Sequence, residues 1–144
     1  MLSLLLLSCN LSDKNQINRS QIANLLRDIE FEFNKQIPNQ SLEKIMSCFH
    51  RDYKHNSNQI LSVENYWSKN LTDYRSIKIE DVDIVDLDDD YAEVRFKMTF
   101  FNTEDKPTLH FMDPKGNGFM SYFKYENSWK IYGNQRDSES NNRF

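Results

Sequence analysis

Cysteine, glycine and proline are scarce in this chain of 144 residues, which contains two, three and three of them. Two cysteines are too few for the disulfide framework of a small secreted scaffold. The longest apolar run falls far short of the roughly 20 residues that a membrane-spanning helix needs. The formal net charge is −4, so the chain lacks the excess of positive charge that attracts nucleic acid. These absences exclude a disulfide scaffold and a transmembrane helix, and they argue against a nucleic-acid partner.

The acidic run "EDVDIVDLDDD" does not fit a calcium-binding loop. Taking Asp86, Asp88 and Asp90 as its first ligands puts Tyr91 where the loop needs glycine. The same register puts Lys97 where a bidentate glutamate belongs. We therefore interpret the run as an exposed strand edge followed by a turn.

Other motifs for metals, cofactors and nucleophiles are also missing. His50 and His55 are five residues apart and would not share a helical face as paired zinc ligands do. Cys48 and His50 would point to opposite sides of a helix, so they form no local nucleophile pair, and Cys48 is expected at the edge of the core. The sequence has no glycine loop that cradles phosphate and no serine-hydrolase elbow. We expect no metal, no cofactor and no catalytic set.

The opening "MLSLLLLSCN" places a short apolar run directly before a cysteine. The tetrad from Leu6 to Cys9 resembles the lipobox of bacterial lipoproteins, in which the cysteine is diacylated and becomes the new N-terminus. No basic residue precedes the run, in contrast to an ordinary signal peptide. We expect lipid on Cys9, which would anchor the protein in a bacterial cell envelope on the periplasmic or cell-surface side. Residues 1–9 would be the signal remnant and residues 10–19 a polar tether.

One domain is expected over residues 20–135, followed by a polar tail over residues 136–144. Three helical patterns open the domain, with Ser20, Ser41 and Ser62 as their expected N-cap residues. Pro38 ends the first helix. Residues 50–60 are polar and are expected to form a loop between the second and third helices.

The period changes from helical to alternating after Tyr74. Residues 76–87 alternate with a slip near Glu80 and Asp81, which predicts a strand with a bulge. Residues 91–101 alternate cleanly, which predicts a strand with one buried face. Three further strands, "TLHFM", "GFMSYFKY" and "WKIYG", follow. We expect an α+β fold, with three N-terminal helices packed on a curved antiparallel sheet.

The ending "GFMSYFKYENSWKIYGNQ" and the segment "MSCFHRDY" resemble the last hairpin and the end of the second helix in the nuclear transport factor 2-like superfamily. This resemblance covers nearly the whole domain. It implies a cone in which the helices close over the concave sheet and leave a cavity. Some members use that cavity as an active site, whereas many only bind or assemble.

The catalytic branches of the superfamily fit poorly. The isomerase branch implies a carboxylate a few residues after "FHRDY", where this chain has His55, Asn56 and Ser57. Asp52 lies nearby, but a charge at a helix end is usually solvated. The dehydratase branch implies a histidine with an aspartate, and only His110 with Asp52 could form such a pair. We expect a binding domain; the alternative is an envelope enzyme of isomerase or dehydratase type.

A ligand site is expected inside the cone. Phe96 and Met98 would line the concave sheet, Trp67 would cover it, and Tyr53 would reach it from the loop. His110, within the apolar segment "LHFM", is the expected polar group. Such a site suits a small apolar or amphipathic ligand, or a protein partner. In the alternative, all five side chains fill the core.

The resemblance also implies pairing through the outer face of the sheet. Alternation places Phe101, Tyr122 and Tyr132 on that face. Exposed aromatic residues on a sheet often mark an interface. A homodimer is therefore a further expectation.

Overall fold

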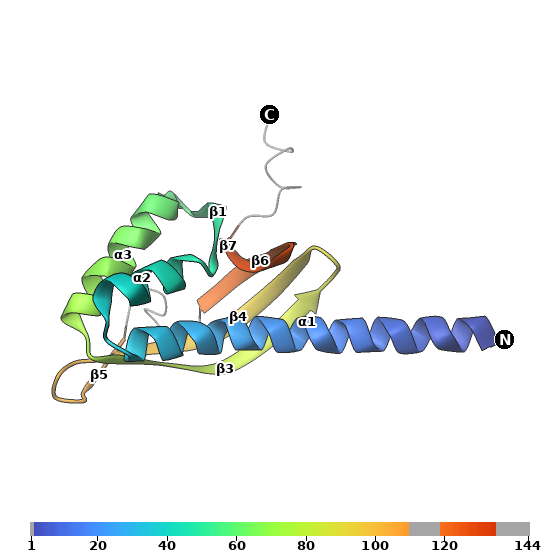
Figure 1. The fold of residues 1–144 in the computed structure, drawn as a ribbon, viewed down its shortest axis with the longest axis horizontal. Helices are drawn as coiled ribbons and strands as arrows, with labels where there is room; N and C mark the ends of the chain where they lie inside the picture. Colours follow the sequence, from blue (N-terminus) through green and yellow to red (C-terminus); the bar gives the residue numbers. More distant parts are fainter. Residues whose placement is uncertain (1, 110–118, 135–144) are drawn as a thin grey trace.

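Three helices pack on a curved sheet in the computed structural model, which describes residues 2–109 and 119–134 (Figure 1). The predicted α+β fold is confirmed, although His110 lies outside the described residues. The helices are α1 (Leu2–Asn34), α2 (Pro38–Met46) and α3 (Ile60–Asp73). The strands are β1 (Phe49–His55), β2 (Asn58–Gln59), β3 (Ser76–Leu87), β4 (Tyr91–Phe101), β5 (Pro107–Leu109), β6 (Phe119–Glu126) and β7 (Ser128–Gly133).

The strands lie side by side in the order β2-β1-β7-β6-β4-β3, and β5 pairs with β4. The long strands β3 and β4 occupy the predicted residues 76–87 and 91–101. The predicted bulge is also present, because the register shifts between Glu80 and Asp83 and Asp81 has a positive φ of 54°. The buried face of β4 is as predicted, with Ala92, Val94, Phe96, Met98 and Phe100 all buried.

The polar segment 50–60 is not a loop, and this prediction is wrong. It forms β1 and β2, and β1 pairs in parallel with β7, which makes the sheet mixed. The pairing demands a close approach of two backbones at Gly133, whose φ is +111° and where an added Cβ would lie 1.9 Å from the Lys54 carbonyl oxygen. Most side chains of β1 are polar, so the strand lacks the apolar alternation that indicates a strand in a sequence. Its parallel partner, β7, lies about 80 residues away in the chain, so no local pattern indicates the pairing.

The predicted helix starts at Ser20, Ser41 and Ser62 are wrong. Helix α1 begins at Leu2, so the segment 10–19 that was expected to be a polar tether is helical. Helix α2 begins with Pro38, which suits a first helical position because its missing N–H has no partner there. Helix α3 begins at Ile60. The division of the chain into signal remnant, anchor segment and domain stays a prediction.

Side chains of α1 hydrogen-bond to the backbone of β3, the edge strand of the sheet. The Asn34 side chain accepts from the Ile77 N–H at 2.8 Å and donates to the Ile77 carbonyl at 3.0 Å. Glu30 accepts from the Ile79 N–H at 2.6 Å. These side chains replace the neighbouring strand that an edge strand lacks, and they hold α1 against the sheet.

The N-terminal part of α1 also contacts the body of the domain. Lys14 pairs with Asp89 at 3.0 Å, and the Trp129 indole donates to Asn18 at 3.3 Å. Beyond these contacts the helix projects past the sheet (Figure 1). Within the described residues, no helix carries an apolar stretch long enough to cross a membrane.

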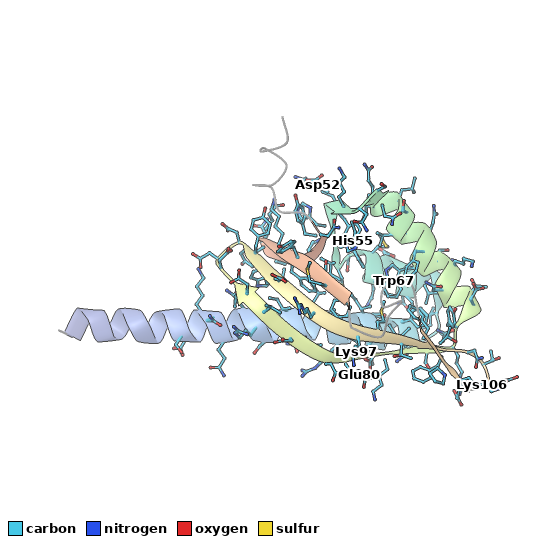
Figure 2. All side chains as sticks on the ribbon, turned by 180° about the vertical axis from the view of Figure 1, so that it is seen from behind. Asp52, His55, Trp67, Glu80, Lys97 and Lys106 are labelled. Carbon is cyan, nitrogen blue, oxygen red and sulfur yellow. The ribbon has the colours of Figure 1, made fainter. Side chains whose placement is uncertain are left out.

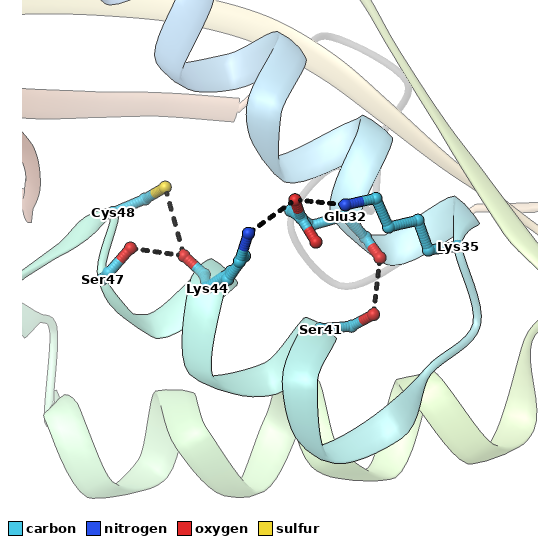
Figure 3. A network of polar contacts seen from close by, with 6 residues as sticks. All are labelled: Glu32, Lys35, Ser41, Lys44, Ser47 and Cys48. Carbon is cyan, nitrogen blue, oxygen red and sulfur yellow. Dashed lines mark hydrogen bonds and ion pairs between the residues drawn. The ribbon is translucent and has the colours of Figure 1, made fainter.

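A polar network holds the corner between α1 and α2 (Figure 3). The Ser41 hydroxyl, inside α2, donates to the Glu32 carbonyl at 2.7 Å. The Glu32 carboxylate accepts from Lys35 at 2.9 Å and lies 3.7 Å from Lys44. The hydrogen bond from Lys35 holds the pKa of Glu32 below its usual value, and Lys44 acts in the same direction.

This lowered pKa predicts a loss of stability in acid. Because the folded state binds the Glu32 proton more weakly than the unfolded state, the carboxylate stabilises the fold above its unfolded pKa of 4.5. That contribution disappears as the pH falls through the lower folded pKa. We expect Glu32→Gln to flatten the pH dependence of the free energy of unfolding below about pH 5, as measured by urea denaturation. Asp89→Asn, which removes an exposed carboxylate, is the control. If the free energy of unfolding of Glu32→Gln depends on pH in acid as that of the wild type does, the lowered pKa of Glu32 is contradicted.

Candidate functional site

The interior between α3 and the sheet is closely packed. A void of about 10 Å³ remains at its centre, which is room for about one water molecule. All of the side chains around it are apolar. They are Leu26, Ile29, Phe49, Trp67, Ile79, Phe96, Met98 and Ile131.

The structure brings together three of the predicted ligand-binding residues. Trp67, Phe96 and Met98 all line the void. Tyr53 lies farther out, and the ring of Phe49 stands between it and Trp67, with centroid distances of 5.5 and 6.3 Å. Figure 2 shows Trp67 between helix α3 and the sheet. The ligand-binding role of these residues stays a prediction.

The inner face of α3 carries polar groups that the sequence analysis did not select. The amide of Asn70 lies beside the hydroxyl of Tyr66, which is four residues, or about one helical turn, earlier in α3. Burial raises the pKa of Tyr66, and it raises the pKa of Tyr53 to about 12, so both hydroxyls stay protonated at neutral pH. The Trp67 indole nitrogen is buried without a hydrogen-bond acceptor in the described part of the chain. A polar residue three positions after Trp67, on the same helical stripe, was the available signal.

His50 belongs to a different cluster, on the opposite face of the sheet from Phe49. Its Nδ1 accepts from the Asp52 N–H at 3.0 Å, so the proton is on Nε2, which donates to Glu126 at 2.8 Å. This hydrogen bond lowers the pKa of Glu126. Lys124 also pairs with Glu126, at 3.1 Å, and lies over the ring of Tyr132. The cluster is a satisfied polar network outside the interior.

The remaining candidate residues have structural surroundings. Asp52 is exposed on β1, and its suggested pairing with His110 falls outside the described residues. The Asp88 carboxylate caps the turn after β3 by accepting from the N–H groups of Asp90 and Tyr91. Burial, followed by the nearby charge of Asp28, raises the pKa of the Cys48 thiol to about 11, which makes it a poor nucleophile at neutral pH. Within the described residues, no group of acidic, histidine and cysteine side chains could hold a metal ion.

Two larger hollows lie on the outside of the domain. A groove of about 780 Å³ separates α1 from the bulge of β3, between Arg19 and Glu30 on the helix and Ile79 and Ile84 on the strand. A second hollow of about 330 Å³ lies between α1 and the β6–β7 hairpin. Each hollow exposes polar and apolar side chains in similar measure, so its overall composition alone does not indicate a ligand-binding site.

The family model of the anti-sigma-I factor RsgI9 C-terminal domain matches residues 32–141, which is most of the chain. This chain belongs to the RsgI9 C-terminal domain family. No curated protein shows significant similarity to it.

Solved structures place this member of the RsgI9 C-terminal domain family in the nuclear transport factor 2-like fold. A nuclear transport factor 2-like protein of unknown function from Shewanella oneidensis MR-1 superposes with a TM-score of 0.61 at 16% identity, covering 80% of this chain and 94% of the other. A candidate scytalone dehydratase from Novosphingobium aromaticivorans gives a TM-score of 0.62 at 13% identity, covering 85% and 84%. A candidate dehydratase of the nuclear transport factor 2-like family from Streptomyces avermitilis gives 0.53 at 11%, covering 82% and 94%. Identities this low establish the shared fold alone.

Because the void is small, we predict that the ring of Phe96 is packed against its neighbours in the core. We expect Phe96→Ala to lower the free energy of unfolding by about 3–5 kcal/mol, because the ring fills space that its neighbours would not close. Leu61→Ala, at an exposed position of α3, should change it by less than about 0.5 kcal/mol. Urea denaturation measures both. A loss at Phe96 as small as that at Leu61 would mean that the ring borders a larger open cavity.

Proposed function

We propose that this protein is a non-catalytic binding domain, held at a bacterial cell envelope by lipid on Cys9, which takes a small apolar or amphipathic ligand into the interior of its cone. The observation that carries this proposal is the composition of the interior. The void is bordered by aromatic and aliphatic side chains, and α3 buries a few neutral polar groups in the same interior, among them the indole of Trp67 and the amide of Asn70. An apolar interior with a few polar groups is the usual composition of a small-molecule site.

Binding is preferred over catalysis because of what the described lining contains. General acid–base chemistry needs a carboxylate, an imidazole or a comparable group within reach of the substrate. Among the described residues, none of the side chains that border the void is a carboxylate or an imidazole. The His50–Glu126 pair lies on the other face of the sheet and cannot serve the interior. The family is named for a domain of an anti-sigma factor, which is consistent with a binding role.

Ligand entry requires α3 to move away from the sheet. The void of about 10 Å³ does not hold an organic molecule in the closed state. Helix α3 begins without a side-chain hydrogen bond from its N-cap residue, Gln59, which leaves its first turn less stable than a capped one. Because the open state is a minor one, the apparent affinity is lowered by the fraction of molecules that are open.

The lipid anchor is proposed from the tetrad that ends at Cys9. In the structure, the backbone of this segment belongs to α1. Among the side chains of the helix whose burial is described, from residue 12 onward, the first core residue is Ile22, thirteen residues after Cys9. At about 1.5 Å per residue, a lipid on Cys9 would hold the domain about 20 Å from the point of attachment.

The anchor predicts a membrane-bound protein with an altered mass. Expressed in a bacterial host with a complete signal sequence, the wild type should fractionate with membranes and gain the mass of a diacylglyceryl group. We expect Cys9→Ser to abolish both effects, whereas Cys48→Ser, the matched control, should keep both. Membrane fractionation and mass spectrometry provide the measurement. Persistence of Cys9→Ser in the membrane fraction would show that another segment anchors the protein.

The binding site predicts stabilisation by an apolar probe. We expect saturating ethylbenzene to raise the melting temperature of the wild type by roughly 2–5 °C, because it binds the folded state alone. Trp67→Ala should lose this shift. Phe31→Ala, which removes a ring that is 63% exposed, should keep it.

Thermal unfolding followed by circular dichroism measures these shifts. A wild type whose melting temperature is unaffected by ethylbenzene would argue for a core that never opens. Turnover of an added carbonyl compound by the wild type would instead favour the enzymatic alternative.

A further inference from the structure

The hollow of about 330 Å³ between α1 and the β6–β7 hairpin lies on the outside of the domain. None of the described residues that border it also borders the void between α3 and the sheet, so the two spaces are separate. Asp28 of α1 is the one residue of its described lining that is charged at neutral pH. Because the rest of that lining is neutral, Asp28 sets the charge of the hollow.

The Asp28 carboxylate has no counter-ion within the domain. It makes no hydrogen bond and no ion pair with any described residue. The neighbouring Arg27 donates to Asn24 at 3.2 Å and borders the other groove of α1, beside β3. Glu32, one turn further along the helix, differs because it pairs with Lys35 at 2.9 Å. The charge of Asp28 is therefore available to a ligand.

The charge of Asp28 also acts on the wall of the hollow. Cys48 borders the same space, and burial raises the pKa of its thiol to about 11, with the charge of Asp28 as the next cause. Lys130 lowers the pKa of Cys48, but its effect is smaller than that of Asp28. The charges around the thiol therefore give a negative potential, which favours a cation in the hollow.

Two aromatic rings border the hollow next to this charge. Tyr125 and Trp129 are paired across the β6–β7 hairpin, with ring centroids 5.4 Å apart and an interplanar angle of 57°. Tyr125 is 39% exposed, whereas Trp129 is buried and its indole donates to Asn18 at 3.3 Å, which holds the ring in place. The faces of tyrosine and tryptophan attract cations, and those of organic ammonium ions in particular.

These groups together select the class of ligand. An anion would be repelled by Asp28 and would find no lysine or arginine in the described lining. A metal ion needs several ligands, and the described residues contain no group of acidic, histidine and cysteine side chains that could hold one. A cation with apolar substituents uses both features, since its charge meets the carboxylate and its substituents meet the rings.

We propose that this hollow binds a small organic ammonium ion, whose charge is neutralised by Asp28 and whose alkyl groups contact the rings of Tyr125 and Trp129. The hollow is open in the structure, so binding requires no movement of α3. The site is separate from the interior of the cone. The inference therefore goes beyond the proposed function and does not depend on it.

Choline and 3,3-dimethylbutan-1-ol test the proposal, because they have nearly the same shape and differ by a positively charged nitrogen in place of a carbon. At low salt, where charges are weakly screened, the wild type should bind choline about tenfold more tightly than the alcohol. In a ¹⁵N–¹H spectrum, choline should move the indole N–H resonance of Trp129. The resonance of Trp67, in the separate interior, is the internal control and should stay in place.

Asp28→Asn removes the charge and keeps the shape of the side chain. In this variant the affinity for choline should fall about tenfold, to that of the alcohol, while the affinity for the alcohol changes less than about twofold. Asp86→Asn, which removes an exposed carboxylate of β3, is the matched control for net charge and should keep the preference for choline. Tyr125→Leu should weaken choline binding at least threefold, because it removes the exposed ring.

The outcomes decide whether this hollow is the site. Equal affinity of the wild type for the two probes would overturn the proposal, and so would a preference that Asp28→Asn keeps. A choline-induced shift of Trp67 with an unmoved Trp129 would place the cation in the interior and would also overturn it. A tenfold preference that Asp28→Asn abolishes and Asp86→Asn keeps, with a shifted Trp129 resonance, supports it. None of these results bears on the binding of ethylbenzene in the interior.

Discussion

The attachment of α1 to the edge of β3 is the constraint on which the rest of the structure depends. The Asn34 amide takes the place of a peptide unit, because it donates one hydrogen bond to the Ile77 carbonyl and accepts another from the Ile77 N–H. The Glu30 carboxylate accepts a third hydrogen bond from the Ile79 N–H. An open sheet edge needs such partners, because unpaired backbone groups beside a packed helix would cost free energy. Once α1 is fixed there, its apolar stripe covers the concave face of the sheet, and Phe33 contacts the rings of Trp67 and Phe100. Helices α2 and α3 then complete the cover.

The same packing explains the character of the candidate site. Rings from α1, β1 and β4 meet at Trp67 of α3, so the interior is apolar and almost full. Polar groups there are few, and the indole nitrogen of Trp67 is buried without an acceptor among the described residues. The described carboxylate and imidazole groups are held elsewhere. Glu32 serves the corner of α1 and α2, and Glu126 serves the His50 cluster on the outer face. The chemistry available inside the cone is therefore hydrogen-bond donation in apolar surroundings.

Predictions from the sequence failed where a contact joins distant parts of the chain. The polar segment 50–60 has no apolar alternation that would mark a strand, yet β1 forms because β7 offers it a parallel partner. Ser41 has the identity of an N-cap residue, but it lies inside α2, where its hydroxyl bonds the Glu32 carbonyl of the preceding helix. Asn70 is an ordinary polar residue in the sequence. Only the packing of α3 against the aromatic core buries its amide.

The sequence by itself determined the strands β3 and β4, the buried face of β4, the bulge near Asp81 and the α+β class. These features depend on the alternation of neighbouring residues, which is a local property that the order of side chains records directly. It also marked Trp67, Phe96 and Met98 as residues that meet. Tertiary structure alone decided the parallel pairing of β1, the edge capping by Asn34, the size of the void and the burial of the Trp67 indole nitrogen without an acceptor among the described residues. Each of these depends on atoms that are far apart in the chain, and no local pattern reports which groups remain without a partner after the chain has packed.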